Sequence, residues 1–158
     1  MILYLLRHAE AEVLAASDAV RQLTPKGQQQ AARVAKFCLA GGIKPEVILT
    51  SPVRRARQTA DVVAESLPEA ELIEVPWAAC GMAPERARSE LAAYRKFSGV
   101  MLVGHQPDLG CLAASLLGLL SPGNLRVRKS LLAGIDLAAG ASEGAGQLQF
   151  FVPSKLMG

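Results

Sequence analysis

The chain has 158 residues, about the length of one domain, and 51% of them are apolar, which is enough for a substantial core. Aromatic residues make up only 4% and the formal net charge is +3, a balance that argues against general nucleic-acid binding. The three cysteines, Cys38, Cys80 and Cys111, are widely spaced and form no Cys-x-x-Cys pair, so the sequence predicts buried, reduced thiols rather than a zinc site or a disulfide framework.

Short apolar runs alternate with stretches of helical periodicity along the chain. In chain order we expect a strand at 2–6, a loop at 9–23, a helix at 25–40, a strand at 47–50, a helix at 52–66, a strand at 71–75, a helix at 84–97, a strand at 100–103, a helix ending near 117, a basic loop at 121–130, and strands at 131–137 and 147–152. This alternation predicts an α/β fold with three layers, in which helices flank a mostly parallel sheet within one domain over residues 1–158.

Two of the predicted helix starts carry recognisable capping residues. Thr24 suits the N-cap and Pro25 the first helical position of one helix, and Ser51 and Pro52 suit the same places in the next. The second of these helices then opens with an arginine run that includes Arg55. The N-terminal end of a helix favours negative charge, so arginines there indicate a bound anion.

Polar residues that could carry chemistry follow the predicted buried strands. Arg7 and His8 come directly after the first strand, Arg55 follows the second, and His105 follows the strand at 100–103. A charged pair at the end of a buried strand is costly unless it has a use. Because ligands of open α/β sheets bind outside the carboxyl ends of the strands, we expect these four side chains to converge if the strands are parallel neighbours.

Two imidazoles and two guanidiniums around one point predict a site for phosphate or a similar oxyanion. Arginine binds two phosphate oxygens at once, and a helix N-terminus adds backbone N–H donors. A neutral histidine can attack phosphorus as a nucleophile, and the arginines would stabilise the charge that develops on the oxygens. No cluster of Asp or Glu at strand ends indicates a magnesium site, so we expect a mechanism without metal or cofactor.

The N-terminus lacks the basic start of a signal peptide, and the apolar run at 109–120 is too short to span a bilayer. We therefore expect a cytoplasmic protein that contacts no membrane.

Three motifs together resemble the histidine phosphatase superfamily, which has the phosphoglycerate-mutase-like fold. Leu-Arg-His-Ala-Glu at 6–10 is similar to the Arg-His-Gly signature, the segment from Ser51 to Thr59 to the second motif, and Val-Gly-His at 103–105 to the motif of the second histidine. Leu-Thr-x-x-Gly at 23–27 also matches. The short length and the segment Ser-Asp-Ala-Val-Arg-Gln-Leu-Thr resemble the SixA-type phosphohistidine phosphatases, small members with no inserted cap domain.

The resemblance implies a role for each matching residue. His8 would be the nucleophile, and Arg7, Arg55 and His105 would bind the phosphoryl group. The backbone N–H of Gln106 would add a donor. Arg21 matches a loop position from which it would contact substrate. Ala9 stands where most of the family has glycine, a change that the SixA-like members share.

The substrate expectation depends on a missing acid. Larger relatives place a carboxylate to protonate an ester leaving group, and here Glu74 and Glu85 lie in the corresponding region without a motif that fixes either. The P–N bond of phosphohistidine needs no such acid, and a site without a cap should be open to a protein side chain. We therefore expect a phosphorylated protein, such as a histidine phosphotransfer domain, as the substrate.

Two alternatives stay open from the sequence alone. One is a small-molecule phosphomonoesterase of the same superfamily, which would need Glu74 or Glu85. The other is a phosphate-binding interaction module without catalysis. In every version the basic loop containing Arg126 and Lys129 is either a docking surface for an acidic partner or a solvated turn.

Overall fold

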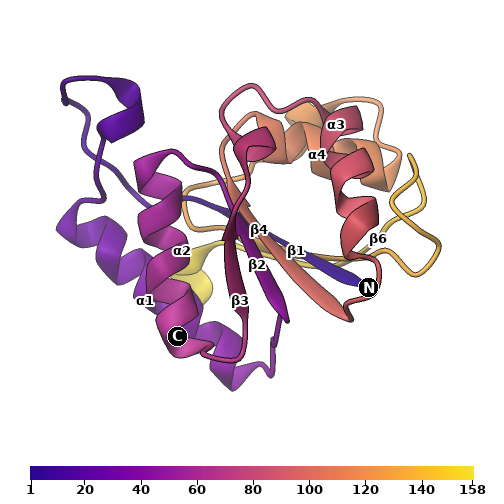
Figure 1. Ribbon diagram of the computed structural model, residues 1–158, viewed down its shortest axis with the longest axis horizontal. Coiled ribbons are helices and arrows are strands. Elements are labelled where there is room, and N and C mark those ends of the chain that lie inside the picture. Colours follow the sequence, from indigo (N-terminus) through magenta and orange to yellow (C-terminus); the bar gives the residue numbers. More distant parts are fainter.

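A six-stranded sheet forms the middle layer of the computed structural model, which describes all of residues 1–158 (Figure 1). The strands are β1 (Ile2–Arg7), β2 (Val47–Thr50), β3 (Glu71–Glu74), β4 (Gly99–Gly104), β5 (Leu132–Asp136) and β6 (Gln147–Val152). Their order across the sheet is β3-β2-β4-β1-β5-β6. The first four of these are mutually parallel, and β5 runs antiparallel to both of its neighbours.

Four α-helices cover the two faces of the sheet, as Figure 1 shows. They are α1 (Pro25–Ala40), α2 (Arg54–Ser66), α3 (Pro84–Leu91) and α4 (Asp108–Leu117). The pair α1 and α2 packs on one face through a cluster that includes Val34, Ala60 and Met101, and the pair α3 and α4 packs on the other through Leu91, Leu112 and Leu102. The predicted α/β architecture with helices on both sides of a mostly parallel sheet is confirmed.

The strands at the centre are buried on both faces, which explains their continuous apolar runs. Every residue of β2 and β4 is buried, as expected for parallel strands between two helical layers. By contrast, β3 and β6 lie at the sheet edges and are half-buried or exposed. The expectation of buried cysteines is right for Cys38 and wrong for Cys80, which is exposed, and for Cys111, which is half-buried. No helix combines the length and the apolarity that crossing a membrane would require.

Two predicted helix boundaries are wrong. The second helix begins at Arg54, with Val53 as its N-cap, and not at Pro52. The predicted cap, Ser51, accepts a hydrogen bond from the Val53 backbone N–H at 3.2 Å, but it lies before the helix and also contacts His105. The helix predicted over 84–97 ends at Leu91, where the chain tightens into a 3-10 turn and turns back toward the start of β4.

The first predicted helix start is confirmed. Thr24 is the N-cap of α1 and its hydroxyl accepts the Gly27 backbone N–H at 3.1 Å, with Pro25 in the first position. The start of α1 packs tightly on the loop after β1, since a Cβ on Gly27 would lie 2.0 Å from the carbonyl oxygen of Glu10. A glycine is therefore required where this helix closes against the segment that follows His8.

Candidate active site

The carboxyl ends of three neighbouring strands bring the predicted residues together. Parallel pairing places β4 between β1 and β2. The His8 backbone N–H donates to the Gly104 carbonyl at 3.0 Å, and the Ser51 N–H donates to the Val103 carbonyl at 3.0 Å. The rings of His8 and His105 consequently lie 5.3 Å apart, measured between centroids. The expected convergence at one edge of the sheet is what the structure contains.

His8 is held in one neutral tautomer. Its side chain is buried, with 6% of the residue exposed. The ring Nδ1 lies 2.7 Å from the carbonyl oxygen of Ala9, and because a carbonyl can only accept, Nδ1 carries the proton. This leaves a lone pair on Nε2, which accepts a hydrogen bond from Arg55 Nε at 3.2 Å.

The surroundings of His8 also oppose its protonation. Burial is the main cause that lowers the pKa of His8 to about 3, and the charges of Arg55, His105 and Arg7 act in the same direction. The hydrogen bond to Ala9 acts the other way but is outweighed. At neutral pH the ring is therefore uncharged and its Nε2 lone pair is available, which is the state that a nucleophile needs.

Arg55 is the central cation of the site. It lies in the first turn of α2 and is buried. Its Nη1 donates to the backbone carbonyl of Asp18 at 2.9 Å, and its Nη2 forms an ion pair with Asp18 Oδ2 at 3.1 Å. Asp18 begins a short 3-10 turn, Asp18–Val20, within the loop after β1. The sequence did not identify this carboxylate as a partner of Arg55.

The Asp18 contact makes the site more closed than expected. The absence of a cap domain led us to expect an open nucleophile, yet His8 is nearly buried because the Arg55 guanidinium lies on its Nε2. Asp18 pairs with that guanidinium while its own side chain stays 62% exposed. Access to Nε2 therefore depends on Arg55 exchanging partners.

Thr59 connects the two halves of the site and was missed from the sequence. Its hydroxyl donates to the Arg55 backbone carbonyl at 2.7 Å and accepts the Ala9 backbone N–H at 3.0 Å. The side chain is fully buried. Thr59 therefore fixes the turn after His8 against the helix that carries Arg55. The available signal was its position four residues after Arg55, on the same side of α2.

His105 has one free ring nitrogen. Its Nε2 lies 2.7 Å from the Ser51 hydroxyl, whereas its Nδ1 is buried and has no hydrogen-bond partner in the protein. Burial, followed by the charge of Arg55, lowers the pKa of His105 to about 4, although the nearby carboxylate of Asp108 raises it. Like His8, this ring is neutral at pH 7.

Arg7 supplies the second guanidinium. Its Nη1 donates to the carbonyl of Val127 at 2.9 Å, and its Nε is buried without a partner in the protein. Burial and the neighbouring Arg55 charge lower the pKa of Arg7. A second guanidinium next to that of Arg55, together with nitrogens that lack partners, forms an arrangement suited to an oxyanion.

Two further predicted residues lie at the margin of this arrangement. The backbone N–H of Gln106 makes no hydrogen bond within the protein, and its side chain accepts the Gly110 N–H at 3.1 Å. Arg21 pairs with Asp18 Oδ1 at 2.9 Å, so it reaches Arg55 only through that carboxylate. Its contact with substrate remains a prediction.

The carboxylates considered as acids are engaged elsewhere. Glu74 lies 3.4 Å from Arg57, which also pairs with Asp61. Glu85 lines a separate hollow together with Arg88. Neither glutamate forms a hydrogen bond or ion pair with His8, Arg55 or His105.

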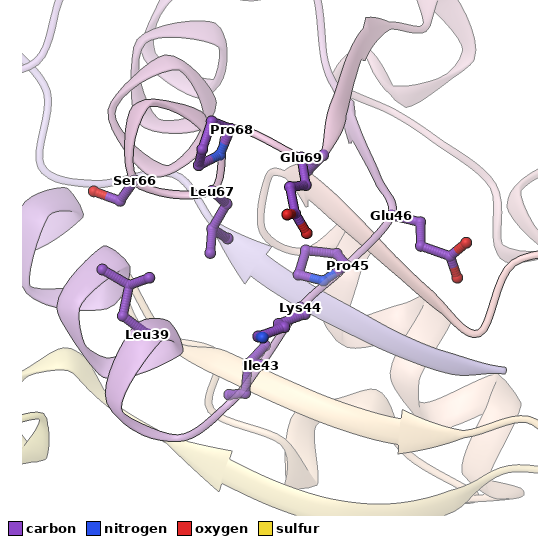
Figure 2. Close-up of a pocket in the computed structure, with 10 residues that line it drawn as sticks. Leu39, Ile43, Lys44, Pro45, Glu46, Ser66, Leu67, Pro68 and Glu69 are labelled. Atoms are coloured by element: carbon purple, nitrogen blue, oxygen red, sulfur yellow. The ribbon is translucent and has the colours of Figure 1, made fainter.

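An apolar hollow lies at the other end of the sheet. Its lining residues precede β2 and β3 and include Ile43, Lys44, Leu67 and Pro68 (Figure 2). It contains no histidine, cysteine or arginine. Ligand chemistry in α/β sheets belongs at the carboxyl ends of the strands, so this hollow is not the candidate active site.

Comparison with known proteins gives consistent relatives. The sequence model of the histidine phosphatase superfamily (branch 1) matches residues 3–96. An uncharacterized protein of Picosynechococcus is 35% identical over 147 residues, which covers 88% of this chain and 87% of that protein. The phosphohistidine phosphatase SixA of Escherichia coli is 29% identical over 119 residues, covering 73% of this chain and 74% of SixA.

A solved structure extends the likeness to the whole fold. The structure of the protein histidine phosphatase SixA complexed with tungstate superposes with a TM-score of 0.89 at 25% identity, and the match covers 98% of both chains.

Proposed function

This chain belongs to the histidine phosphatase superfamily, branch 1, and we propose that it hydrolyses phosphohistidine on a protein through a phosphorylated His8. The observation that carries the proposal is the neutral His8 ring, whose Nε2 lone pair lies 3.2 Å from Arg55 Nε and whose centroid lies 5.3 Å from that of His105. One imidazole is thus prepared to attack, and the groups around it are prepared to bind an anion.

The first step is transfer of the phosphoryl group to His8. Nε2 attacks phosphorus in line and a new P–N bond forms, while the P–N bond to the substrate imidazole breaks. The substrate imidazole carries a proton on its other ring nitrogen, so it takes the electron pair of the broken bond and leaves as neutral imidazole. For this to occur, Arg55 Nε must stop donating its hydrogen bond to His8 Nε2 and donate it to a phosphoryl oxygen instead. Arg55 would then stabilise charge on the transferring group at the moment when the nucleophile becomes free.

Arg7 and His105 complete the anion site in this proposal. Arg7 Nε and His105 Nδ1 are buried nitrogens without partners, and phosphoryl oxygens would satisfy both. The free backbone N–H of Gln106 would provide a further donor. In the second step water attacks the phosphorylated His8, the P–N bond breaks, and the water's hydrogens leave with inorganic phosphate as neutral His8 returns.

The choice of phosphohistidine over a phosphate ester rests on the leaving group. An ester oxygen gains about 10²–10⁴-fold from a general acid. Glu74 pairs with Arg57, and Glu85 lines a different hollow, so neither is placed to supply that proton. An imidazole that already carries a proton on its other ring nitrogen leaves as a neutral group and needs no proton from the enzyme. The E. coli relative is named a phosphohistidine phosphatase, which supports the same choice.

The test is a panel of substrates with one variant. We expect the protein to release phosphate from phosphohistidine proteins, including a histidine phosphotransfer domain, and His8→Ala to release none. Rapid hydrolysis of a sugar phosphate, with no release from any phosphohistidine protein, would instead assign the chain to small-molecule phosphomonoesterases. Undiminished activity of His8→Ala on every substrate would refute the covalent mechanism.

A further inference from the structure

A strongly basic hollow lies beside Arg7. It has a volume of about 510 Å³ and is lined by ten residues, of which only Val127 is hydrophobic. Its six cationic lining residues are Arg7, Lys26, Arg126, Arg128, Lys129 and Lys155. They come from the end of β1, the start of α1, the loop before β5 and the C-terminal turn Ser154–Leu156, so four distant segments build one surface. We call this surface the basic hollow.

Most of this charge is not neutralised by the protein. Lys26 pairs with Glu10 at 3.0 Å, but no carboxylate lies within ion-pair distance of Arg126, Arg128, Lys129 or Lys155. Cations held together without counter-charges repel one another and produce a local positive potential. That potential is far larger than the net charge of +3 suggests, because it is concentrated in one hollow.

The fold holds the basic hollow in a fixed position relative to the candidate active site. Val127 is buried in the core, while its neighbours Arg126 and Arg128 are exposed, so the loop is anchored and its cations face solvent. The Val127 carbonyl accepts from Arg7 Nη1 at 2.9 Å. The Ser130 backbone N–H donates to the carbonyls of Arg7 at 3.1 Å and His8 at 3.3 Å. The loop is therefore tied directly to the segment that carries the proposed nucleophile.

We infer that the basic hollow docks an acidic surface of the phosphorylated protein substrate, next to the phosphohistidine that enters at His8. This inference rests on the proposed function. Charges contributed by four segments exceed what a single phosphate could contact, whereas several carboxylates of one protein face would match them. A nucleic acid fits less well, because no aromatic residue lines the hollow to stack bases.

Synthetic phosphohistidine peptides test the inference. One peptide carries four glutamates beside the phosphohistidine, and its partner carries four glutamines. At about 50 mM salt, where the Debye length is about 14 Å, we expect kcat/KM for the glutamate peptide to exceed that for the glutamine peptide by about tenfold or more, mainly through KM. The preference should collapse at about 0.5 M salt.

Matched charge reversals locate the effect. Arg126→Glu with Arg128→Glu should remove the preference, so that the ratio of the two kcat/KM values falls to about one or below. Lys36→Glu with Lys44→Glu changes the net charge equally but lies outside the basic hollow, with Lys44 in the separate hollow of Figure 2, and should keep the preference. All four side chains are exposed, so both variants should fold.

The outcomes separate the two proposals. A wild-type preference that survives the Arg126/Arg128 reversal, or no preference in the wild type, would overturn the docking inference and leave the proposed function standing. Failure of the wild type to cleave either peptide would overturn the proposed function and the docking inference with it. Stronger competition by an oligonucleotide than by an unphosphorylated glutamate peptide of equal charge would assign the basic hollow to nucleic acid and refute the inference.

Discussion

Acidification from pH 7 to pH 5 should destabilise this protein through its two histidines. The folded-state pKa is about 3 for His8 and about 4 for His105, whereas an unfolded histidine titrates near 6.5. Between these values the unfolded chain binds more protons than the folded one, so stability falls as pH falls. Integrating over pH 7 to 5 gives a loss of about 2 kcal/mol for each histidine, or about 4 kcal/mol for both.

Urea unfolding at the two pH values measures this loss directly. Carboxylates with a lowered folded-state pKa, such as Asp18 and Glu46, also contribute less to the stability of the protein on acidification. That loss occurs mainly as the pH falls through and below their unfolded pKa values near 4. The window from pH 7 to 5 therefore isolates the histidines. Because the chain has only two histidines, a stability loss in this window can be attributed to His8 and His105.

The variant His8→Gln should lose only about half as much stability over this window, since one titrating group is removed. The variant Arg57→Gln, at a half-buried position away from both histidines, should lose as much stability over this window as the wild type. An equal loss in the wild type and in His8→Gln, at unchanged m-value, would mean that His8 is not held neutral by its surroundings and would refute the electrostatic argument.

Three further predictions concern the groups around His8. Thr59→Val should cost about 1–3 kcal/mol in the free energy of unfolding, because it leaves the buried Ala9 N–H unpaired, and should slow phosphate release; a neutral change by urea unfolding would contradict this. Asp18→Asn should tighten tungstate binding several-fold by calorimetry, because it weakens the competing partner of Arg55, whereas Asp61→Asn should not; weaker binding would mean that Asp18 positions Arg55 instead. Long-range ¹⁵N–¹H spectra at pH 6 should find His8 neutral with its proton on Nδ1, and an imidazolium signal would be inconsistent with Arg55 Nε donating a hydrogen bond to the Nε2 lone pair.

Much of the fold could be predicted because the central strands are read directly from apolar runs. The predicted bounds of β2 and β6 agree with the structure, and the alternation of strands and helices predicted the parallel sheet. Helix boundaries were less accurate. Ser51 and Pro52 have the composition of a helix start, but the Ser51 hydroxyl is used by His105, and the helix begins two residues later. A displacement of one or two residues is common at helix ends, where the local signal is weakest.

The positions of site residues that follow strands could be predicted, because the order of the strands fixes them. The positions of site residues in loops could not, because they depend on the loop conformation. His8 and His105 follow strands that had to be neighbours for the site to exist, and they are. Asp18 lies in a loop without periodicity, so nothing in the sequence placed its carboxylate against Arg55. For the same reason the closure of the nucleophile by Arg55 was missed. The basic loop was visible in the sequence, but its union with Lys26 and Lys155 needed the fold.

The central claim is that His8 carries the phosphoryl group between substrate and water. Rapid mixing with a phosphohistidine protein, followed by alkaline quench and mass spectrometry, tests it directly. We predict one acid-labile phosphate on His8 in the wild type and none in His8→Ala. Phosphate release without label on His8, or label on another residue in the wild type, would contradict the account.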